Sequence, residues 1–217
     1  MAPRLRCDDD DVNRWSSATA SRDGNTPTRR LWLIRHGEST WNASGLVQGQ
    51  LDPPLSRSGR EQAARCARAL AAGPGPEALY ASDLRRALET AAPIAETLAL
   101  RVRREAALRE RALGDAEGNP TSDLGPRRSG IEAGHVVDAD VGPAGGESVR
   151  QLYDRAARCV ARILSAHTGD VVVVCHGGVV RVLLAWLDGV TPDAMAWPEI
   201  DNGVPIVRSL PSALICA

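Results

Sequence analysis

Residues 31–42 have the sequence LWLIRHGESTWN, in which four apolar residues lead directly into an Arg35-His36-Gly37 turn. A continuous apolar run of this kind is typical of a strand buried on both faces. Gly37 lets the backbone turn sharply without a Cβ clash. We therefore expect Arg35 and His36 at the carboxyl end of a buried strand, where open α/β sheets bind their ligands.

A second apolar run ends in the same way. Residues 171–175 are VVVVC, and His176 and Gly177 follow directly. One histidine at a strand end is usually structural, but two strands that each end in histidine-glycine can bring two imidazoles to one sheet edge. Together with Arg35, and with Asn42, whose amide can donate to an anion, the repeated pattern favours a functional site.

Periodicity predicts the remaining elements. Helices are expected from Ser56 or Ser58 to about Ala72, from Ser82 or Asp83 to about Leu98 with a kink or break at Pro93, from a cap at Glu147 to about Ala166, and from Gly178 to about Leu187; strands are expected at 79–81, 100–102 and, at a sheet edge, 202–207. Alternating strands and helices indicate an α/β fold, a three-layer αβα sandwich with a mostly parallel central sheet and helices on both faces.

Two parts of the chain have a different composition. Residues 1–29 carry an acidic run at 8–11 and little apolar surface, which predicts a disordered N-terminal tail, with a partner-binding segment or a misplaced start as alternatives. Residues 30–217 are expected to form one domain. A Gly/Pro-rich insertion at about 114–146 has no aromatic residue and is typical of a functional lid or a mobile loop.

Composition excludes several functions. All 26 basic residues are arginine, so a Walker-type phosphate loop and Schiff-base chemistry, which both need lysine, are excluded. The formal net charge of −1 gives no reason to expect a nucleic-acid partner. The five cysteines have no CxxC spacing and fit a reducing cytoplasm. No apolar run approaches a membrane span, and no signal-peptide core is found at the N-terminus.

The motif at residues 35–42, with Arg-His-Gly-Glu followed by Trp-Asn, resembles the signature of the histidine phosphatase superfamily, the phosphoglycerate-mutase-like proteins. The resemblance covers residues 31–207. It implies that His36 is a nucleophile that forms a phosphohistidine and attacks as neutral imidazole. Nearby arginines lower the pKa of such a histidine. Arg35 and Asn42 are expected to bind the phosphate, whereas Trp41 is expected to pack.

The other phosphate ligands come from two later segments. Residues 82–90, SDLRRALET, are similar to the family's second motif, in which the arginine directly precedes the alanine, so Arg86 is chosen as the phosphate ligand over Arg85. His176 is expected to donate to the phosphoryl group, helped by the backbone N–H of Gly177. A metal pair of His36 and His176 competes with this interpretation, but no carboxylate motif with ligand spacing accompanies it, and no metal or other cofactor is expected.

Glu110 is the expected proton donor. Leu108-Arg109-Glu110 and the following GDAEG at 114–118 resemble the family's leucine-any-glutamate and glycine-any-aromatic-glutamate-glycine segment. On the sequence alone, Glu110 is one of many charges at 103–111, and Glu117 is the next candidate. Ala116 replaces the usual aromatic residue, which makes the substrate pocket less certain than the phosphate pocket.

The resemblance implies a metal-independent phosphomonoesterase, similar to histidine acid phosphatases, that acts on a small phosphorylated metabolite. Mutases of the family carry a long insertion before the second histidine and a tryptophan where this chain has Gln50, and both features favour hydrolysis here. Mutase-type transfer and a catalytically silent phosphate-binding or scaffold protein are the alternatives. Neither nucleic acid nor membrane is an expected partner, and a homodimer is compatible with the sequence.

Overall fold

The computed structural model describes residues 28–125 and 130–211 of the 217-residue chain. Most of the expected N-terminal tail lies outside the described residues. Its last two residues, Thr28 and Arg29, were wrongly assigned to it, since they begin strand β1. Arg29 is buried and donates from Nη1 to the carbonyl oxygens of Leu164, at 2.6 Å, and of His167. This arginine joins the domain through a long-range contact that local composition does not reveal.

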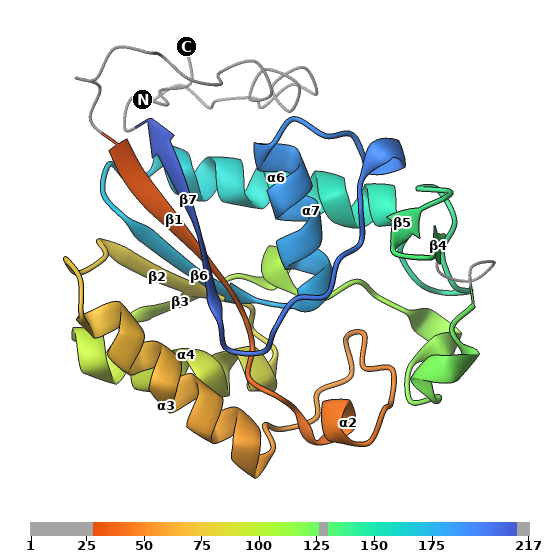
Figure 1. The fold of residues 1–217 in the computed structure, drawn as a ribbon, viewed down its shortest axis with the longest axis horizontal. Helices are drawn as coiled ribbons and strands as arrows, with labels where there is room; N and C mark the ends of the chain where they lie inside the picture. Colours follow the sequence, from red (N-terminus) through yellow and green to blue (C-terminus); the bar gives the residue numbers. More distant parts are fainter. Residues whose placement is uncertain (1–27, 126–129, 212–217) are drawn as a thin grey trace, which may run out of the picture.

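Five strands form one sheet in the order β3-β2-β6-β1-β7 (Figure 1). They are β1 (Thr28–Arg35), β2 (Ala78–Ala81), β3 (Val102–Arg104), β6 (Val171–Cys175) and β7 (Pro205–Pro211). β7 pairs antiparallel with β1, whereas the other neighbours pair in parallel. β3 begins two residues later than the predicted strand at 100–102. β7 is an edge strand as predicted, but it begins at Pro205, because a strand end tolerates the missing N–H of proline.

Helices cover both faces of the sheet (Figure 1). They are α3 (Arg57–Ala71) and α4 (Arg85–Leu98) on one face, and α6 (Val149–Ser165) and α7 (Gly177–Leu187) on the other. The side chains of β6 alternate between the two: Val172 and Val174 belong to the core with α3 and α4, and Val171 and Val173 to the core with α6 and α7. This explains the unbroken valine run, and the predicted αβα fold is confirmed.

Two predicted helix caps are wrong, and of the two outcomes expected at Pro93, a kink or a break, the break does not occur. Ser148, not Glu147, caps α6, accepting from the N–H of Gln151, while Glu147 forms an ion pair with Arg155 at 2.7 Å. Pro93 does not split α4, which continues to Leu98. A proline removes one helical hydrogen bond, and the buried neighbours Ala91 and Ile94 hold the helix on the sheet.

The N-cap of α4 is Leu84, whose apolar side chain makes no capping hydrogen bond. The two predicted caps have other partners. Asp83 pairs with Arg109 at 2.7 Å, and the Ser82 hydroxyl hydrogen-bonds with His176 at 2.8 Å. Long-range contacts therefore displaced the local cap.

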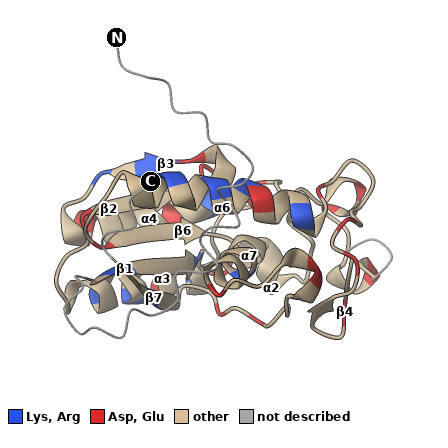
Figure 2. Cartoon of the chain, turned by 90° about the horizontal axis from the view of Figure 1, so that it is seen from above, with Lys and Arg blue, Asp and Glu red and all other residues tan. Residues whose placement is uncertain are grey.

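The remaining elements are short. They are α2 (Thr40–Ala43), η2 (Ala106–Leu108), η3 (Gly114–Ala116), η4 (Thr121–Asp123), β4 (Ile131–Glu132), β5 (His135–Val136) and η5 (Pro192–Ala194). Acidic residues (red) and basic residues (blue) are interspersed along the described part of the chain in Figure 2. Across residues 28–125 and 130–211, no helix has the length and apolarity that a membrane crossing requires.

The carboxyl ends of β1, β6 and β2 meet at one edge of the sheet. The backbone N–H of His36 donates to the carbonyl oxygen of Cys175 at 2.9 Å, and that of Ser82 donates to Val174 at 2.9 Å. The residues that leave these three strands are therefore hydrogen-bonded neighbours, as parallel pairing requires.

Candidate active site

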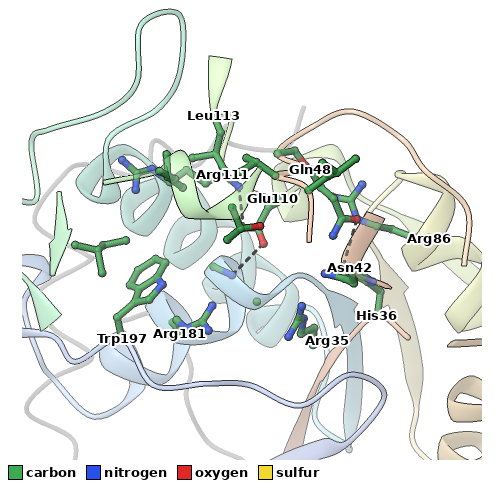
Figure 3. A pocket seen from close by; sticks show the side chains of 18 residues that line it. Arg35, His36, Asn42, Gln48, Arg86, Glu110, Arg111, Leu113, Arg181 and Trp197 are labelled. Carbon is green, nitrogen blue, oxygen red and sulfur yellow. Dashed lines mark hydrogen bonds between the residues drawn. The ribbon is translucent and has the colours of Figure 1, made fainter. Parts of the chain in front are cut away.

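A cavity of about 250 Å³ opens at this edge of the sheet (Figure 3). Its wall includes Arg35, His36, Asn42, Arg86, Glu110 and Gly177, so six of the seven site residues expected from the sequence come together in one place. They come from the end of β1 and the turn that follows it, from α2, α4 and α7, and from the segment after η2. The cavity therefore gathers cationic groups, an imidazole and one carboxylate from segments far apart in the sequence.

The imidazole of His36 is fixed in one tautomer. Its Nδ1 lies 2.6 Å from the carbonyl oxygen of Gly37, which can only accept, so Nδ1 carries the proton. Nε2 accepts from Arg86 Nε at 3.2 Å. Burial, and then the charges of Arg86 and Arg35, hold the pKa of His36 well below its ordinary value of 6.5. Near pH 7 the side chain is a neutral imidazole with the Nε2 lone pair directed toward Arg86.

The turn that carries His36 is held from two sides. Thr90 Oγ1 accepts from the N–H of Gly37 at 2.9 Å and donates to the carbonyl oxygen of Arg86 at 2.7 Å. Asn202 donates to the carbonyl oxygen of His36 at 2.8 Å. Neither Thr90 nor Asn202 was expected at the site from the sequence. The available signal for Thr90 is its spacing of four residues from Arg86, which places both on one face of α4.

Gly37 is needed for a close backbone approach. A Cβ at this position would lie 2.4 Å from the carbonyl oxygen of Gly59 in α3. The glycine therefore lets the turn after β1 pack directly on the first turn of a helix.

Arg86 is completely buried, and backbone oxygens fix its guanidinium. Nη1 donates to Leu51 at 2.6 Å and Nη2 donates to Gly49 at 2.7 Å, which leaves Nε for His36. Arg85, the alternative weighed from the sequence, is exposed and pairs with Glu89 at 2.6 Å. The structure thus brings Arg86, rather than Arg85, to the imidazole.

Arg35 lies on the cavity wall at the end of β1. Its Nη1 donates to the carbonyl oxygen of Ile200 at 2.6 Å, whereas its Nε is buried and has no partner among the described residues. Burial lowers the pKa of both Arg35 and Arg86, but a guanidinium stays charged at neutral pH. Arg35 therefore offers an unused donor to an anion in the cavity.

His176 is the N-cap of α7, and its ring lies beside that of His36, with centroids 5.2 Å apart. Its Nε2 hydrogen-bonds with Ser82 Oγ at 2.8 Å, and its Nδ1 is buried without a partner among the described residues. Burial, followed by the charge of Arg86, lowers the pKa of His176 well below 6.5. The imidazole is completely buried, and Gly177 and Gly178 form the cavity wall at this strand end.

Glu110 presents its carboxylate to the cavity between two backbone donors. Oε1 accepts from the N–H of Arg111 at 2.8 Å, and Oε2 accepts from the N–H of Gly178 at 3.0 Å (Figure 3). Glu117, the other candidate acid, accepts from the N–H groups of Gln50 at 3.0 Å and Leu113 at 2.8 Å. Glu117 thus joins two loops, while Glu110 lines the cavity.

Asn42 lies in α2 and also lines the cavity. Its Oδ1 accepts from the N–H and the hydroxyl of Ser39, at 3.1 and 3.2 Å, in the capping box of α2. These bonds occupy the amide oxygen and orient the amide N–H₂ group of Asn42.

The two histidines are poorly suited to hold a metal together. Over the described residues, no group of three or more histidine, cysteine, aspartate or glutamate side chains could hold a metal ion. Each Nε2 has a hydrogen-bond partner, Arg86 for His36 and Ser82 for His176, and the nearby guanidinium disfavours a second cation.

Parts of the predicted insertion contribute to the cavity. Thr121, Leu124 and Ile131, together with Leu113 just before it, are in the wall. This segment therefore helps to form the pocket next to the Arg35 and His36 turn.

Comparisons with known proteins show the family and the fold of this chain. The family model described as histidine phosphatase superfamily (branch 1) matches residues 31–207. A metal-independent phosphoserine phosphatase of Arabidopsis thaliana is 38% identical over 156 residues, which are 70% of this chain and 65% of the relative. A 2,3-bisphosphoglycerate-dependent phosphoglycerate mutase of Brucella anthropi is 35% identical over 192 residues, covering 84% and 93% of the two chains.

Solved structures show the same fold. A mycobacterial glucosyl-3-phosphoglycerate phosphatase in complex with VO3 superposes with a TM-score of 0.72 at 33% identity, over 82% of this chain and 90% of that one.

Proposed function

The chain belongs to the histidine phosphatase superfamily, and on this basis we propose that it hydrolyses small phosphomonoesters without a metal ion, through a phosphohistidine on His36. The observation that carries the proposal is the state of His36. Its proton is held on Nδ1 by Gly37, its pKa is lowered by burial and by two arginines, and its Nε2 faces the cavity cations. These are the properties of a nitrogen nucleophile at neutral pH.

In the first step, His36 Nε2 attacks the phosphorus. The N–P bond forms while the bond to the ester oxygen breaks, and Glu110 gives its proton to the leaving oxygen. Arg86 Nε transfers its hydrogen bond from His36 to a phosphoryl oxygen, and Arg35 Nε binds a second oxygen. Charge that develops on the equatorial oxygens is thereby stabilised by donors already in place.

In the second step, a water molecule attacks the phosphohistidine. Glu110, now a carboxylate, takes a proton from the water as the N–P bond breaks and its electron pair returns to Nε2. Inorganic phosphate leaves, and Glu110 is protonated again. Asn42, His176 and the N–H of Gly177 complete the set of proposed phosphate ligands, the last at the N-terminus of an 11-residue helix, which favours anions.

Mutase-type phosphoryl transfer is the second candidate. The Brucella mutase is matched over 93% of its own length. The long insertion expected in mutases therefore does not distinguish a mutase from a phosphatase here. The feature that still favours hydrolysis is Gln50, which stands where the mutases were expected to carry a tryptophan. Its side chain donates to the carbonyl oxygen of Glu110 at 3.1 Å.

The test is hydrolysis of p-nitrophenyl phosphate in the presence of EDTA. We expect turnover by the wild type and by His135→Ala, whose histidine is exposed, and none by His36→Ala. Loss of turnover on chelation, restored by a divalent metal, contradicts the proposal. A silent phosphate-binding protein would bind phosphate without turnover. With 3-phosphoglycerate and 2,3-bisphosphoglycerate together, a hydrolase releases phosphate, whereas a mutase forms 2-phosphoglycerate.

A further inference from the structure

Arg181 and Trp197 form the end of the cavity that lies away from His36 and Arg86 (Figure 3). Arg181 comes from α7, one helical turn after Gly177, and its side chain reaches the cavity wall. The phosphoryl transfer proposed above uses neither residue. This end of the cavity therefore faces the part of the substrate that leaves.

The guanidinium of Arg181 is held in place, but its terminal nitrogens have no partner within the part of the chain that the structure describes. Nε donates to the carbonyl oxygen of Pro198 at 2.5 Å, and the group stacks on Trp197 with Cζ 5.1 Å from the ring centroid. Among the described residues, neither Nη1 nor Nη2 has a hydrogen bond or an ion pair. A guanidinium with a fixed plane and two free terminal nitrogens matches the two oxygens of a carboxylate.

A second positive charge lies close by. A Cβ on Gly177 would be 2.9 Å from Arg181 Nη1 and 3.5 Å from Arg35 Nε, so both groups face the same glycine. Glu110 and Glu199 act on Arg181 electrostatically, but among the described residues no carboxylate oxygen lies within 4 Å of it. Two partly buried cations next to each other favour binding of anions.

We propose that Arg181 binds a carboxylate on the leaving group, so that the preferred substrates are phosphomonoesters of small hydroxy acids. This inference rests on the proposed phosphatase function, in which the phosphoryl group occupies the His36 end. The carboxylate then lies at the Arg181 end, and the short carbon chain spans the cavity between the two ends, whose wall also includes the apolar side chains of Leu113 and Ile131.

The experiment compares 3-phosphoglycerate with glycerol 3-phosphate, which carries a hydroxymethyl group in place of the carboxylate. One charge-assisted contact corresponds to about ten- to a hundredfold in binding. We expect the wild type to prefer 3-phosphoglycerate by at least about tenfold in kcat/KM. Arg181→Gln should remove this preference, mainly through KM, and change glycerol 3-phosphate less than about threefold.

Two further variants separate recognition from folding. Arg158→Gln removes an exposed arginine of α6 and should leave both substrates unchanged. Arg181→Lys keeps the charge without the fork and should retain part of the preference. Equal losses on both substrates in Arg181→Gln would show that Arg181 only anchors the segment at Pro198, and the absence of a wild-type preference would also overturn the proposal.

Failure of the proposed function is visible separately. If the wild type does not hydrolyse p-nitrophenyl phosphate, the phosphatase proposal fails. Calorimetric binding of 3-phosphoglycerate and glycerol 3-phosphate to the wild type and to Arg181→Gln then decides the carboxylate site by the same criteria.

Discussion

Gly178→Ala should uncouple Glu110 from the phosphate pocket. A Cβ on Gly178 would lie 2.3 Å from Glu110 Oε1 and 3.2 Å from Leu152 Cδ2. Real Cβ atoms do not approach other atoms to less than 3.0 Å, so the carboxylate must move by about 1 Å, a displacement that typically costs a catalytic group about a hundredfold in rate. The three atoms nearest to this Cβ position belong to Glu110 and Leu152, and none belongs to the nucleophile or to an arginine.

The loss should depend on the leaving group. An alkoxide needs the proton from Glu110 in the transition state, whereas a nitrophenolate leaves without it. We expect the first step to slow about a hundredfold on an alkyl phosphate and only a few-fold on p-nitrophenyl phosphate. Burst kinetics isolate this step, because hydrolysis of the phosphohistidine can limit turnover on the activated substrate.

Controls follow from the local geometry. Gly75→Ala places a methyl group in open space and should change neither rate. Glu110→Gln should show the same dependence on the leaving group, and adding Gly178→Ala to it should cost little more, because both changes remove one interaction. Equal losses of Gly178→Ala on both substrates in the first step, or additive losses in the double variant, would refute this reasoning.

Two further predictions concern the histidines. Because burial and two arginines lower the pKa of His36, its imidazole stays neutral below pH 6.5. The acid limb of the kcat/KM profile should therefore lie below pH 6.5 and should move to higher pH in Arg86→Gln. An acid limb at the same pH in both proteins would contradict this role of Arg86. Ser82→Ala leaves His176 Nε2 buried without its partner and should lower the free energy of unfolding by about 1–3 kcal/mol in urea titrations. An unchanged unfolding midpoint would mean that the Ser82–His176 bond is not formed in solution.

The buried strands could be predicted because each carries its own signal. Residues 171–175 form the predicted strand to the residue, since five apolar residues in a row fit a strand between two helical layers. The glycine after each histidine marked the turn. Parallel pairing of β1 with β6 then brings the two strand ends, and thus His36 and His176, together.

Ser56, one of the two residues predicted to cap α3, does cap it, but the caps of α4 and α6 could not be predicted, because the expected side chains have distant partners. Ser82 is a good local cap by composition, but its hydroxyl hydrogen-bonds with His176, 94 residues away. Because Ser82 does not cap α4, Asp52 accepts from the N–H of Arg85 at 2.6 Å and satisfies one free backbone donor at the start of the helix. Glu147 likewise has a partner in Arg155 rather than in its own helix end.

The details that govern reactivity also depend on tertiary contacts. The sequence indicated that His36 needs an acceptor on its second nitrogen but could not identify the carbonyl of Gly37, since this bond depends on the ring orientation within the folded turn. Arg181 was one of 26 identical basic residues. Only the folded chain places it beside Trp197 in the cavity wall.

The central claim is that His36 Nε2 accepts the phosphoryl group without a metal ion. The direct measurement is rapid-quench mass spectrometry of the protein mixed with p-nitrophenyl phosphate in EDTA, with alkaline work-up because phosphohistidine is acid-labile. We expect one added phosphoryl group on the peptide that contains His36, formed at least as fast as steady-state turnover and absent in His36→Ala. A phosphoryl group on His176, or EDTA-resistant turnover with no phosphoprotein even when a burst is seen, would contradict the account.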